Sequence, residues 1–476
     1  MSTPLPRVRF SPAPTGFLHL GSARSALFNW LFARHTGGEM LLRVEDTDLE
    51  RNRPELIDTI LDSLRWLGID WDGEPVHQSD RVDLHRDAVA RLLASGNAYR
   101  CGCSQDEVKA RAEARGGPPG YDGHCRDRDI APGSGVVVRF RTPDDGTTAF
   151  DDVIRGVVAF ENTNLEDFVV QRSDGSPMFL VANAVDDVDM GITHVIRGED
   201  LVNVTPKVLL LREALGVTER PVFAHLPLVL NEKRQKLSKR RDDVAVADYR
   251  ARGFLPSAMA NYLALLGWGP PDGVEVRPVE EIVGLFRLED VNKAGAVFDL
   301  QKLTHVNARH IEALTTEAFV TAARPFLLDQ PWGAAVEADP APFEALAPVV
   351  QERTHTLLDV ADMVDFVYLD EPTVDEAAWE KAMVKGAAAA EILDGIIDAY
   401  EAVDEDGWVH ENGEREPLKE ALLAVGEAHG LKLGKAQAPV RVAVTGRSVG
   451  PPLFESLVVL GRARTLERLR RARARL

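Results

Sequence analysis

A histidine, a glycine and a serine stand together at positions 19 to 22, where a loop rich in proline and glycine gives way to a helical pattern. Free backbone N–H groups and the helix dipole make such a helix start favourable for phosphate. His19 can add a donor there, and Gly21 leaves room for a ligand beside the backbone. The stretch predicts a nucleotide site, and the alternative is a proline-rich loop in an unrelated α/β protein.

A second stretch able to meet phosphate is the basic sequence Lys236-Leu237-Ser238-Lys239-Arg240. A basic loop taken alone is usually solvated surface. The loop supports the nucleotide site because it follows the His19 stretch in the chain at a separation of about 200 residues. The two stretches together favour a nucleotide-dependent enzyme.

The two stretches resemble the two signatures of class I aminoacyl-tRNA synthetases. His19-Leu20-Gly21-Ser22 stands in the place of His-Ile-Gly-His, with a small hydroxyl residue last, as is usual in the glutamyl branch. The Lys236 loop resembles the second signature, which brings lysines to ATP. The resemblance implies His19, Ser22, Lys236 and Lys239 as catalytic residues. It implies ATP and Mg²⁺ at a site formed by those four residues together with Gly21 and Asp200.

Acidic residues follow the strand expected at 40–44, in the sequence Glu45-Asp46-Thr47-Asp48. The carboxyl edge of a parallel sheet is its ligand side. The alternative, that these residues cap the helix beginning near Pro54, accounts for Thr47 or Asp48 better than for Glu45. By resemblance, Glu45 holds the amino group of a glutamate substrate.

Arg197 ends another expected strand, in Thr193-His194-Val195-Ile196-Arg197. A planar guanidinium in a cleft suits a carboxylate, because it can bond both oxygens. The alternative is a salt bridge to Glu199 or Asp200. The resemblance implies a glutamate site, with Phe179 where a tyrosine is usual, made by Arg9, Ser11, Glu45, Phe179, Asn183 and Arg197.

The three cysteines are too few for a disulfide framework in 476 residues. Cys101, Cys103 and Cys125 supply three of four tetrahedral zinc ligands, and Tyr121, His124 or Asp127 would be the fourth. Some family members carry zinc here, and a related shorter enzyme uses a tyrosine placed as Tyr121 is. Two interpretations stay open: zinc on Cys101, Cys103, Tyr121 and Cys125, or a metal-free loop with buried thiols.

The elements that must position these residues alternate between strand and helix in the first half of the chain and become helical later. A strand at 7–10, a helix from Ser22 and a strand at 40–44 open an α/β Rossmann-type catalytic domain. An inserted α+β subdomain and an all-α C-terminal region are expected with it, and the resemblance implies that the C-terminal region binds the anticodon. Further expected elements are helices at 55–67, 80–95, 104–115 and 204–215, β-rich stretches at 136–141, 150–160 and 167–172, a strand at 223–230 and a largely helical region at 247–310.

The resemblance covers nearly the whole chain and sets the expected domain limits. These are the first catalytic half at 1–98, an acceptor-stem-binding insertion at 99–172, the second catalytic half at 173–235, the second-signature loop and stem-contact helices at 236–314, and the anticodon-binding region at 315–476.

Composition restricts where the protein acts. With 75 acidic and 55 basic residues the net charge is −20, so RNA must be bound through local basic patches. Seven arginines at 462–475 form a candidate phosphate patch or a solvated helix end. Without an apolar membrane span or signal peptide, a cytoplasmic protein is expected.

The resemblance to bacterial glutamyl-tRNA synthetases implies a glutamate–tRNA ligase. Its substrates would be L-glutamate, ATP and tRNA(Glu), with tRNA(Gln) left open, and a monomer is expected. Three alternatives remain: a glutaminyl ligase, a shorter tRNA-modifying relative, and an inactive RNA-binding homologue. A β-rich C-terminus would favour the glutaminyl ligase, and a chain ending near residue 310 would favour the shorter relative. Loss of His19 or Lys239 would favour the inactive homologue. This sequence has none of these features.

Overall fold

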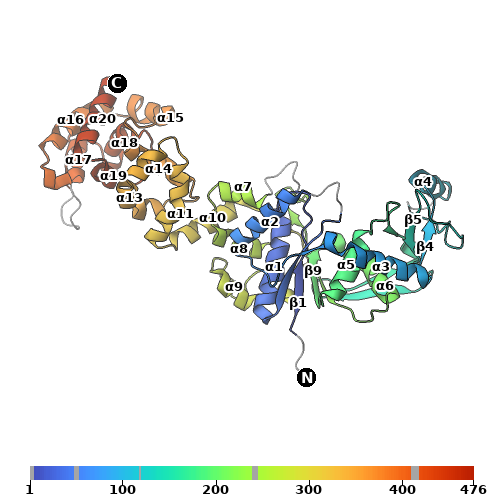
Figure 1. Cartoon of the computed structure of the whole chain (residues 1–476). Coiled ribbons are helices and arrows are strands. Elements are labelled where there is room, and N and C mark those ends of the chain that lie inside the picture. The colour runs from blue at the N-terminus through green and yellow to red at the C-terminus, as the bar shows by residue number, and fades with distance from the viewer. Residues whose placement is uncertain (1–4, 48–52, 117–119, 238–244, 409–416) are drawn as a thin grey trace. The chain divides into compact units, whose positions relative to one another are not determined.

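A computed structural model describes residues 5–47, 53–116, 120–237, 245–408 and 417–476. The chain divides into two compact units (Figure 1). The first comprises Met1–Tyr249 with Pro256–Leu300, and the second comprises Arg250–Leu255 with Gln301–Leu476.

The first unit opens with strand β1 (Arg7–Phe10), helix α1 (Leu20–Thr36) and strand β2 (Glu39–Val44), and the two strands pair in parallel. This confirms the expected strand–helix–strand unit. The helix begins earlier than Ser22 because the His19 side chain accepts a bond from Ser22 N and so acts as the N-cap. It ends at Gly37, whose φ of 66° is a conformation that glycine adopts without a steric penalty.

Two sheets meet where β1 lies beside β9. One has the order β1-β2-β3, with β3 at Val76–His77. The other has the order β7-β6-β10-β9, and its strands β9 (His194–Gly198) and β10 (Val222–Leu226) are parallel. A backbone bond of 2.9 Å from Thr193 N to Arg7 O joins β1 to the residue before β9, and the two strands lie side by side in Figure 1.

The chain leaves this central pair in opposite directions, from β1 to β2 and from β9 to β10. Such a switch opens a crevice at the carboxyl ends of the strands, where α/β folds bind ligands. The α/β Rossmann-type fold class is thereby confirmed.

The β-rich stretch expected at 150–160 is a hairpin of β6 (Thr147–Asp152) and β7 (Gly156–Glu161). Strand β6 also pairs in parallel with β10, so the expected insertion extends the second sheet. A separate antiparallel sheet contains β4 (Ala98–Cys101), β5 (Val137–Phe140) and β8 (Val169–Gln171), and helix α4 (Gln105–Ala114) follows β4.

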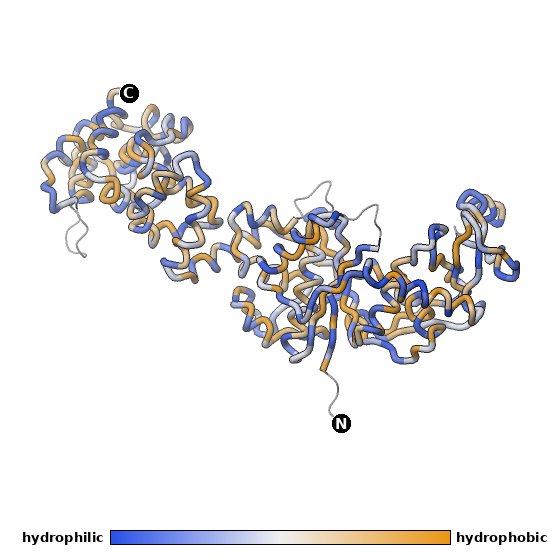
Figure 2. The backbone as a smooth tube through the Cα atoms, viewed as in Figure 1, coloured by the Kyte–Doolittle hydropathy of each residue, from blue (hydrophilic) through white to orange (hydrophobic). Residues whose placement is uncertain are grey.

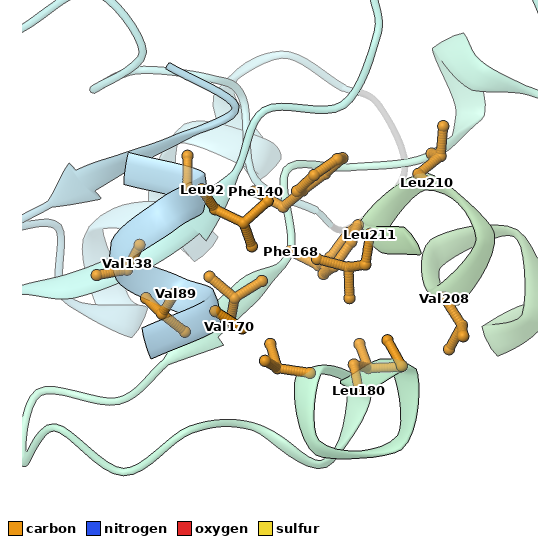
Figure 3. Packing of buried hydrophobic residues seen from close by; sticks show 14 residues of the cluster. Val89, Leu92, Val138, Phe140, Phe168, Val170, Leu180, Val208, Leu210 and Leu211 are labelled. Atoms are coloured by element: carbon orange, nitrogen blue, oxygen red, sulfur yellow. The ribbon is translucent and has the colours of Figure 1, made fainter. Parts of the chain in front are cut away.

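A buried apolar cluster ties this smaller sheet to three helices (Figure 3). The helices are α3 (Val82–Ala94), α5 (Phe179–Asp189) and α6 (Thr205–Ala214). Phe140 and Phe168 stack at its centre with ring centroids 5.2 Å apart. Helix α5, which carries Phe179 and Asn183, is therefore held by packing on a large apolar cluster.

The single strand expected at 223–230 is two strands. Strand β10 ends at Leu226, and β11 (Val229–Leu230) begins after Pro227, which has no N–H for a sheet ladder. Strand β11 pairs with β12 (Ala296–Val297), which interrupts the region expected to be helical at 247–310. The remaining helices of this part are α2 (Pro54–Trp66), α7 (Val246–Ala251), α8 (Pro256–Leu265) and α9 (Val279–Leu285), with short 3-10 turns η1 (Gln78–Arg81), η2 (Asn162–Asn164), η3 (Glu199–Val204) and η4 (Leu288–Asp290).

The second unit contains helices and no strand among the residues described, which confirms the expected all-α region. Along its helices, hydrophobic positions alternate with hydrophilic ones (Figure 2), as expected for helices packed through one face. The elements are α10 (Leu300–Glu312), α11 (Thr316–Leu328), α12 (Gly333–Ala338), α13 (Ala341–Gln351), α14 (Asp359–Tyr368), α15 (Glu376–Trp379), η5 (Glu380–Val384), α16 (Ala389–Ala402), η6 (Glu405–Trp408), α17 (Pro417–Ala428), α18 (Leu433–Thr445), α19 (Leu453–Leu460) and α20 (Arg462–Arg475).

Candidate active site

A cavity of about 450 Å³ is lined by residues at the carboxyl ends of β1 and β9 and at the start of α1. It brings together every expected ATP or glutamate residue that the structure describes. These are Arg9, Ser11, His19, Gly21, Ser22, Glu45, Phe179, Asn183, Arg197, Asp200 and Lys236. Lys239 lies outside the described residues.

His19 and Ser22 form one unit at the start of α1. Nδ1 of His19 accepts a bond from Ser22 N at 3.2 Å, and its Nε2 lies 2.9 Å from Ser22 Oγ. A Cβ on Gly21 would lie 3.3 Å from the His19 ring. A side chain at position 21 would therefore press on the histidine.

Three buried charges form a cluster next to the cavity, and one of them, Arg9, also lines it. Nε of Arg9 and Nη1 of Arg43 both donate to Oδ1 of Asp187, at 3.1 and 2.6 Å. Arg43 also donates to Oδ1 of Asn183 at 3.0 Å. Burial alone would raise the pKa of Asp187, but the charges of Arg9 and Arg43 outweigh burial and hold it below its ordinary value.

Glu45 stands at the edge of this cluster, 3.7 Å from Arg43. Burial raises the pKa of its carboxyl against the opposing charges of Arg43 and Arg9. Its neighbour Asp46 has a structural role, since it accepts bonds from Ser79 N and Ser79 Oγ at 2.8 Å each. The alternative that Thr47 or Asp48 caps the next helix is wrong for Thr47, because the N-cap of α2 is Arg53, and Asp48 lies outside the described residues.

Arg197 forms no ion pair with any carboxylate in the part of the chain that the structure describes. Its Nε donates to Nε2 of His225 at 3.2 Å and its Nη2 to Oγ1 of Thr205 at 2.9 Å. The alternative of a salt bridge to Glu199 or Asp200 is therefore wrong. Burial first, and then the charge of Arg9, lower the pKa of Arg197 to about 10.

The two acidic residues after Arg197 have other partners. Glu199 pairs with Arg155 and accepts a bond from Leu228 N at 2.7 Å. Asp200 pairs with Lys236 at 3.0 Å, and both side chains are more than half exposed. The first of the two signature lysines is thus held at the mouth of the cavity.

The three cysteines gather in the inserted part, with their sulfur atoms all within 4.8 Å of one another. Tetrahedral zinc with Zn–S bonds of about 2.3 Å needs sulfur atoms roughly 3.8 Å apart. Cys101 Sγ donates to the Tyr121 hydroxyl at 3.3 Å, and that hydroxyl accepts a bond from Cys125 N at 2.7 Å. Asp127, in contrast, pairs with Arg141 and is 87% exposed.

The arginines of α20 bind acidic side chains or backbone carbonyls of the second unit. Arg470 pairs with Glu401, Arg473 with Asp394 at 2.8 Å and Arg475 with Glu376 at 2.9 Å. Arg468 is buried and donates to four carbonyls. The exposed side chains of Arg470 and Arg475 thus form surface ion pairs, whereas Arg468 belongs to the interior of the second unit.

The sequence did not single out several residues that shape the site. Asp187 is one of them, although its place one turn after Asn183 on α5 is a signal that it shares that face. Asp152, Thr205 and His225 gave no local signal. Arg24, which ties α1 to the carbonyls of Leu266 and Pro227, gave none either.

A helix start beside a cavity at a topological switch point, with Lys236 lining the same cavity, is the arrangement expected of the catalytic domain of a class I aminoacyl-tRNA synthetase. Residues 6–305 match the family model of class I tRNA synthetases (E and Q), catalytic domain, and residues 318–473 match an anticodon binding domain. Within this class, the chain belongs to the glutamate–tRNA ligase family.

The family assignment rests on similarity over the full length. The chain is 56% identical to the glutamate–tRNA ligase of Frankia casuarinae, covering 99% of this chain and 98% of that one, and 54% identical to that of Salinispora arenicola, covering 99% of each. It resembles the crystal structure of a glutamate tRNA ligase from Elizabethkingia meningosepticum in complex with its amino acid, with 31% identity, a TM-score of 0.85 and 99% of each chain covered. The family predicted from the two signatures is confirmed.

No helix in the described part of the chain has the length and apolar character to cross a membrane.

Proposed function

We propose that the chain attaches L-glutamate to tRNA in two steps. The glutamate carboxylate attacks the α-phosphorus of ATP, pyrophosphate leaves, and the glutamyl-adenylate passes to the 3′-terminal adenosine of tRNA(Glu). The observation that carries this proposal is a single cavity lined both by the start of α1 and by buried arginines. Catalysis rests on positioning and on charge stabilisation.

The ATP site takes its phosphates at the start of α1. His19 and Ser22 line the cavity beside the first free N–H groups of the helix, and Gly21 leaves the approach open. Lys236 and Lys239 neutralise charge that develops on the phosphates, and Asp200 holds Lys236 at 3.0 Å. Mg²⁺ supplies further charge when it is bound with ATP.

The glutamate site has a charge matched to its ligand. Arg9 and Arg43 pair with Asp187, and Arg43 also lies 3.7 Å from Glu45, whereas Arg197 has no carboxylate partner among the described residues, which leaves its positive charge in surplus. Glutamate carries two carboxylates and one ammonium, so its net charge is −1, whereas glutamine is neutral. The surplus therefore favours glutamate.

Unsatisfied polar atoms point to the same ligand. Ser11 Oγ is buried in the cavity wall and has no hydrogen-bond partner among the described atoms, so a bound amino acid would satisfy it. Glu45 takes the substrate ammonium, and Arg197 takes the side-chain carboxylate. Phe179 also lines the cavity and brings no hydroxyl.

The second unit binds the anticodon arm of the tRNA, as its match to an anticodon binding domain supports. The test of the whole proposal is aminoacylation of purified tRNA(Glu) and tRNA(Gln) with glutamate and with glutamine. Charging of tRNA(Glu) with glutamate is expected, and the absence of any glutamyl-tRNA would refute the proposal. Product on tRNA(Gln) would add that tRNA as a substrate.

We also propose a structural zinc ion held by Cys101, Cys103, Cys125 and Tyr121. The clustered sulfur atoms fit the donor set, and among the three candidate fourth ligands Tyr121 is the one whose side chain bonds a cysteine. The positive groups of Arg111, 3.1 Å from Cys103 Sγ, and of Arg139, 3.8 Å from the Tyr121 ring, would offset the charge of the ligands.

A further inference from the structure

Arg197 is fixed in place by neutral groups. Its partners are the imidazole of His225, the hydroxyl of Thr205 and, at 3.4 Å, the carbonyl of Leu201. A buried arginine is usually paired with a carboxylate, because an unpaired buried charge is costly. The arrangement therefore orients the guanidinium and leaves its charge uncompensated until a ligand arrives.

His225 can accept this bond because of its place in the sheet. It lies directly opposite Arg197 in the parallel pair of β9 and β10, so the two side chains share one face. Its side chain is fully buried. Thr205 completes the arrangement from α6, with its Oγ1 3.1 Å from the same Nε2.

Asp152 determines which nitrogen of His225 carries the proton. Its Oδ2 lies 2.6 Å from Nδ1 of His225 and also accepts a bond from His225 N at 3.0 Å. Its Oδ1 accepts bonds from Ile154 N and Arg155 N at 3.0 and 2.9 Å. Because all these partners are donors, the carboxylate stays ionised, the His225 proton stays on Nδ1, and Nε2 presents a lone pair to Arg197.

The charged groups around His225 keep it in that neutral form. Burial and the charges of Arg197 and Arg155 lower the pKa of the imidazole, although Asp152 acts in the opposite direction. A protonated His225 would place an N–H against the N–H of Arg197. The contact between the two residues therefore exists only with the neutral tautomer that Asp152 selects.

We propose that His225, oriented by Asp152, is a positioning residue that holds Arg197 ready for the side-chain carboxylate of glutamate without neutralising it. The proposal rests on the proposed function, since it assigns the glutamate carboxylate to Arg197. A carboxylate in place of His225 would neutralise Arg197 internally and remove its advantage in binding glutamate. A neutral acceptor gives the orientation and keeps the charge.

The test compares His225→Leu, His225→Gln and the control His85→Leu in ATP–pyrophosphate exchange. His85 is also fully buried and hydrogen-bonded to an aspartate, Asp186, at 2.9 Å. His225→Leu should raise the KM for glutamate roughly 10- to 100-fold and leave the KM for ATP unchanged. His225→Gln should recover part of the loss, because its amide oxygen can accept from Arg197, and His85→Leu should raise neither KM selectively.

A folded His225→Leu protein with the wild-type KM for glutamate, or with equal rises in both KM values, would overturn the proposal. If that protein fails to fold, Thr205→Val decides, because valine keeps the shape and removes the second contact to Arg197. The KM for glutamate should then rise several-fold, and an unchanged value overturns the proposal. Arg197→Gln distinguishes failure of this proposal from failure of the proposed glutamate site. A wild-type preference for glutamate in that variant refutes the glutamate site itself.

Discussion

The Nε–H of Arg9 donates to Oδ1 of Asp187 across 3.1 Å, although the two residues are 178 positions apart. Arg9 belongs to β1 and Asp187 to α5, so a buried ion pair links the two halves of the nucleotide fold. The same carboxylate anchors Arg43. The charge cluster next to the proposed glutamate site therefore also contributes to stability.

Asp187→Asn should lower the free energy of unfolding of the first unit by about 3 to 5 kcal/mol, because two buried arginines lose their charged partner. Urea unfolding followed in that unit measures the change. The matched control is Asp189→Asn on the same helix, where the aspartate is 55% exposed, and it should cost at most about 1 kcal/mol.

The same substitution should alter how the free energy of unfolding depends on pH under acid conditions. The fold holds the pKa of Asp187 below its ordinary value of 3.8. Its stabilisation is therefore complete above that value and is lost as the pH falls below about 4. Asp187→Asn should lose less stability than the wild type over that range, and equal losses in the two proteins would contradict the charge pairing.

Much of the site could be predicted because its signals are local. His19, Gly21 and Ser22 mark a helix start, and Glu45 and Arg197 mark strand ends. The residues next to them in the sequence therefore predict where they lie in the fold. The cavity gathers all of them. Local sequence also predicted β1, α1 and β2, with the small error at Leu20 caused by the His19 cap.

The partners of these residues could not be predicted in the same way. Asp152 meets His225 across 73 positions, and the contact exists because β6 and β10 are neighbours in the sheet. Strand order is a property of the whole fold, so no window of sequence contains it. The arginines of α20 illustrate the same limit, since their acidic partners lie on other helices.

Those arginines allow a second stability test. Arg468→Met should destabilise the second unit by about 2 to 4 kcal/mol, because its guanidinium satisfies the carbonyls of Val444, Phe366 and Leu369. Arg470→Gln, which breaks an exposed pair with Glu401, should cost at most about 1 kcal/mol. Thermal unfolding of both variants checks the contrast, and a similar loss in the two would contradict it.

Lys239→Ala should lower kcat more than it raises KM, with a barrier increase of about 2 to 4 kcal/mol, because an ammonium that meets phosphate charge acts chiefly in the transition state. Lys239 lies outside the described residues, so the expectation rests on the signature loop. ATP–pyrophosphate exchange measures it, with Lys233→Ala as a control in the same basic region. A wild-type rate of glutamate activation in Lys239→Ala would remove the loop from the mechanism.

Metal analysis tests the cysteine cluster. Protein purified without chelator should contain one equivalent of zinc, and Cys125→Ser should contain none, because three thiolates and Tyr121 form the proposed site. Tyr121→Phe should weaken zinc binding, whereas His124→Ala should not. Zinc-free wild-type protein after growth in zinc-replete medium would mean that the thiols are simply buried.

Selection of glutamate over glutamine can be tested at Arg197. The two amino acids are nearly equal in shape, so the pocket must separate them by hydrogen-bond polarity and charge. Arg197 supplies only donors and keeps its proton, so it suits a carboxylate and would place a donor against the NH₂ of glutamine. Glutamine would also leave the buried charge of Arg197 unneutralised, at a cost of about 2 to 5 kcal/mol.

Arg197→Gln should therefore strongly weaken the binding of glutamate and reduce the preference for glutamate over glutamine, without changing the KM for ATP. Arg197→Lys should be intermediate, because an ammonium restores the charge and lacks the two-bond geometry. The measurement is kcat/KM for both amino acids in the wild type and the two variants. If Arg197→Gln keeps the wild-type preference for glutamate, Arg197 has a structural role with His225 and Thr205, and selection occurs elsewhere in the cavity.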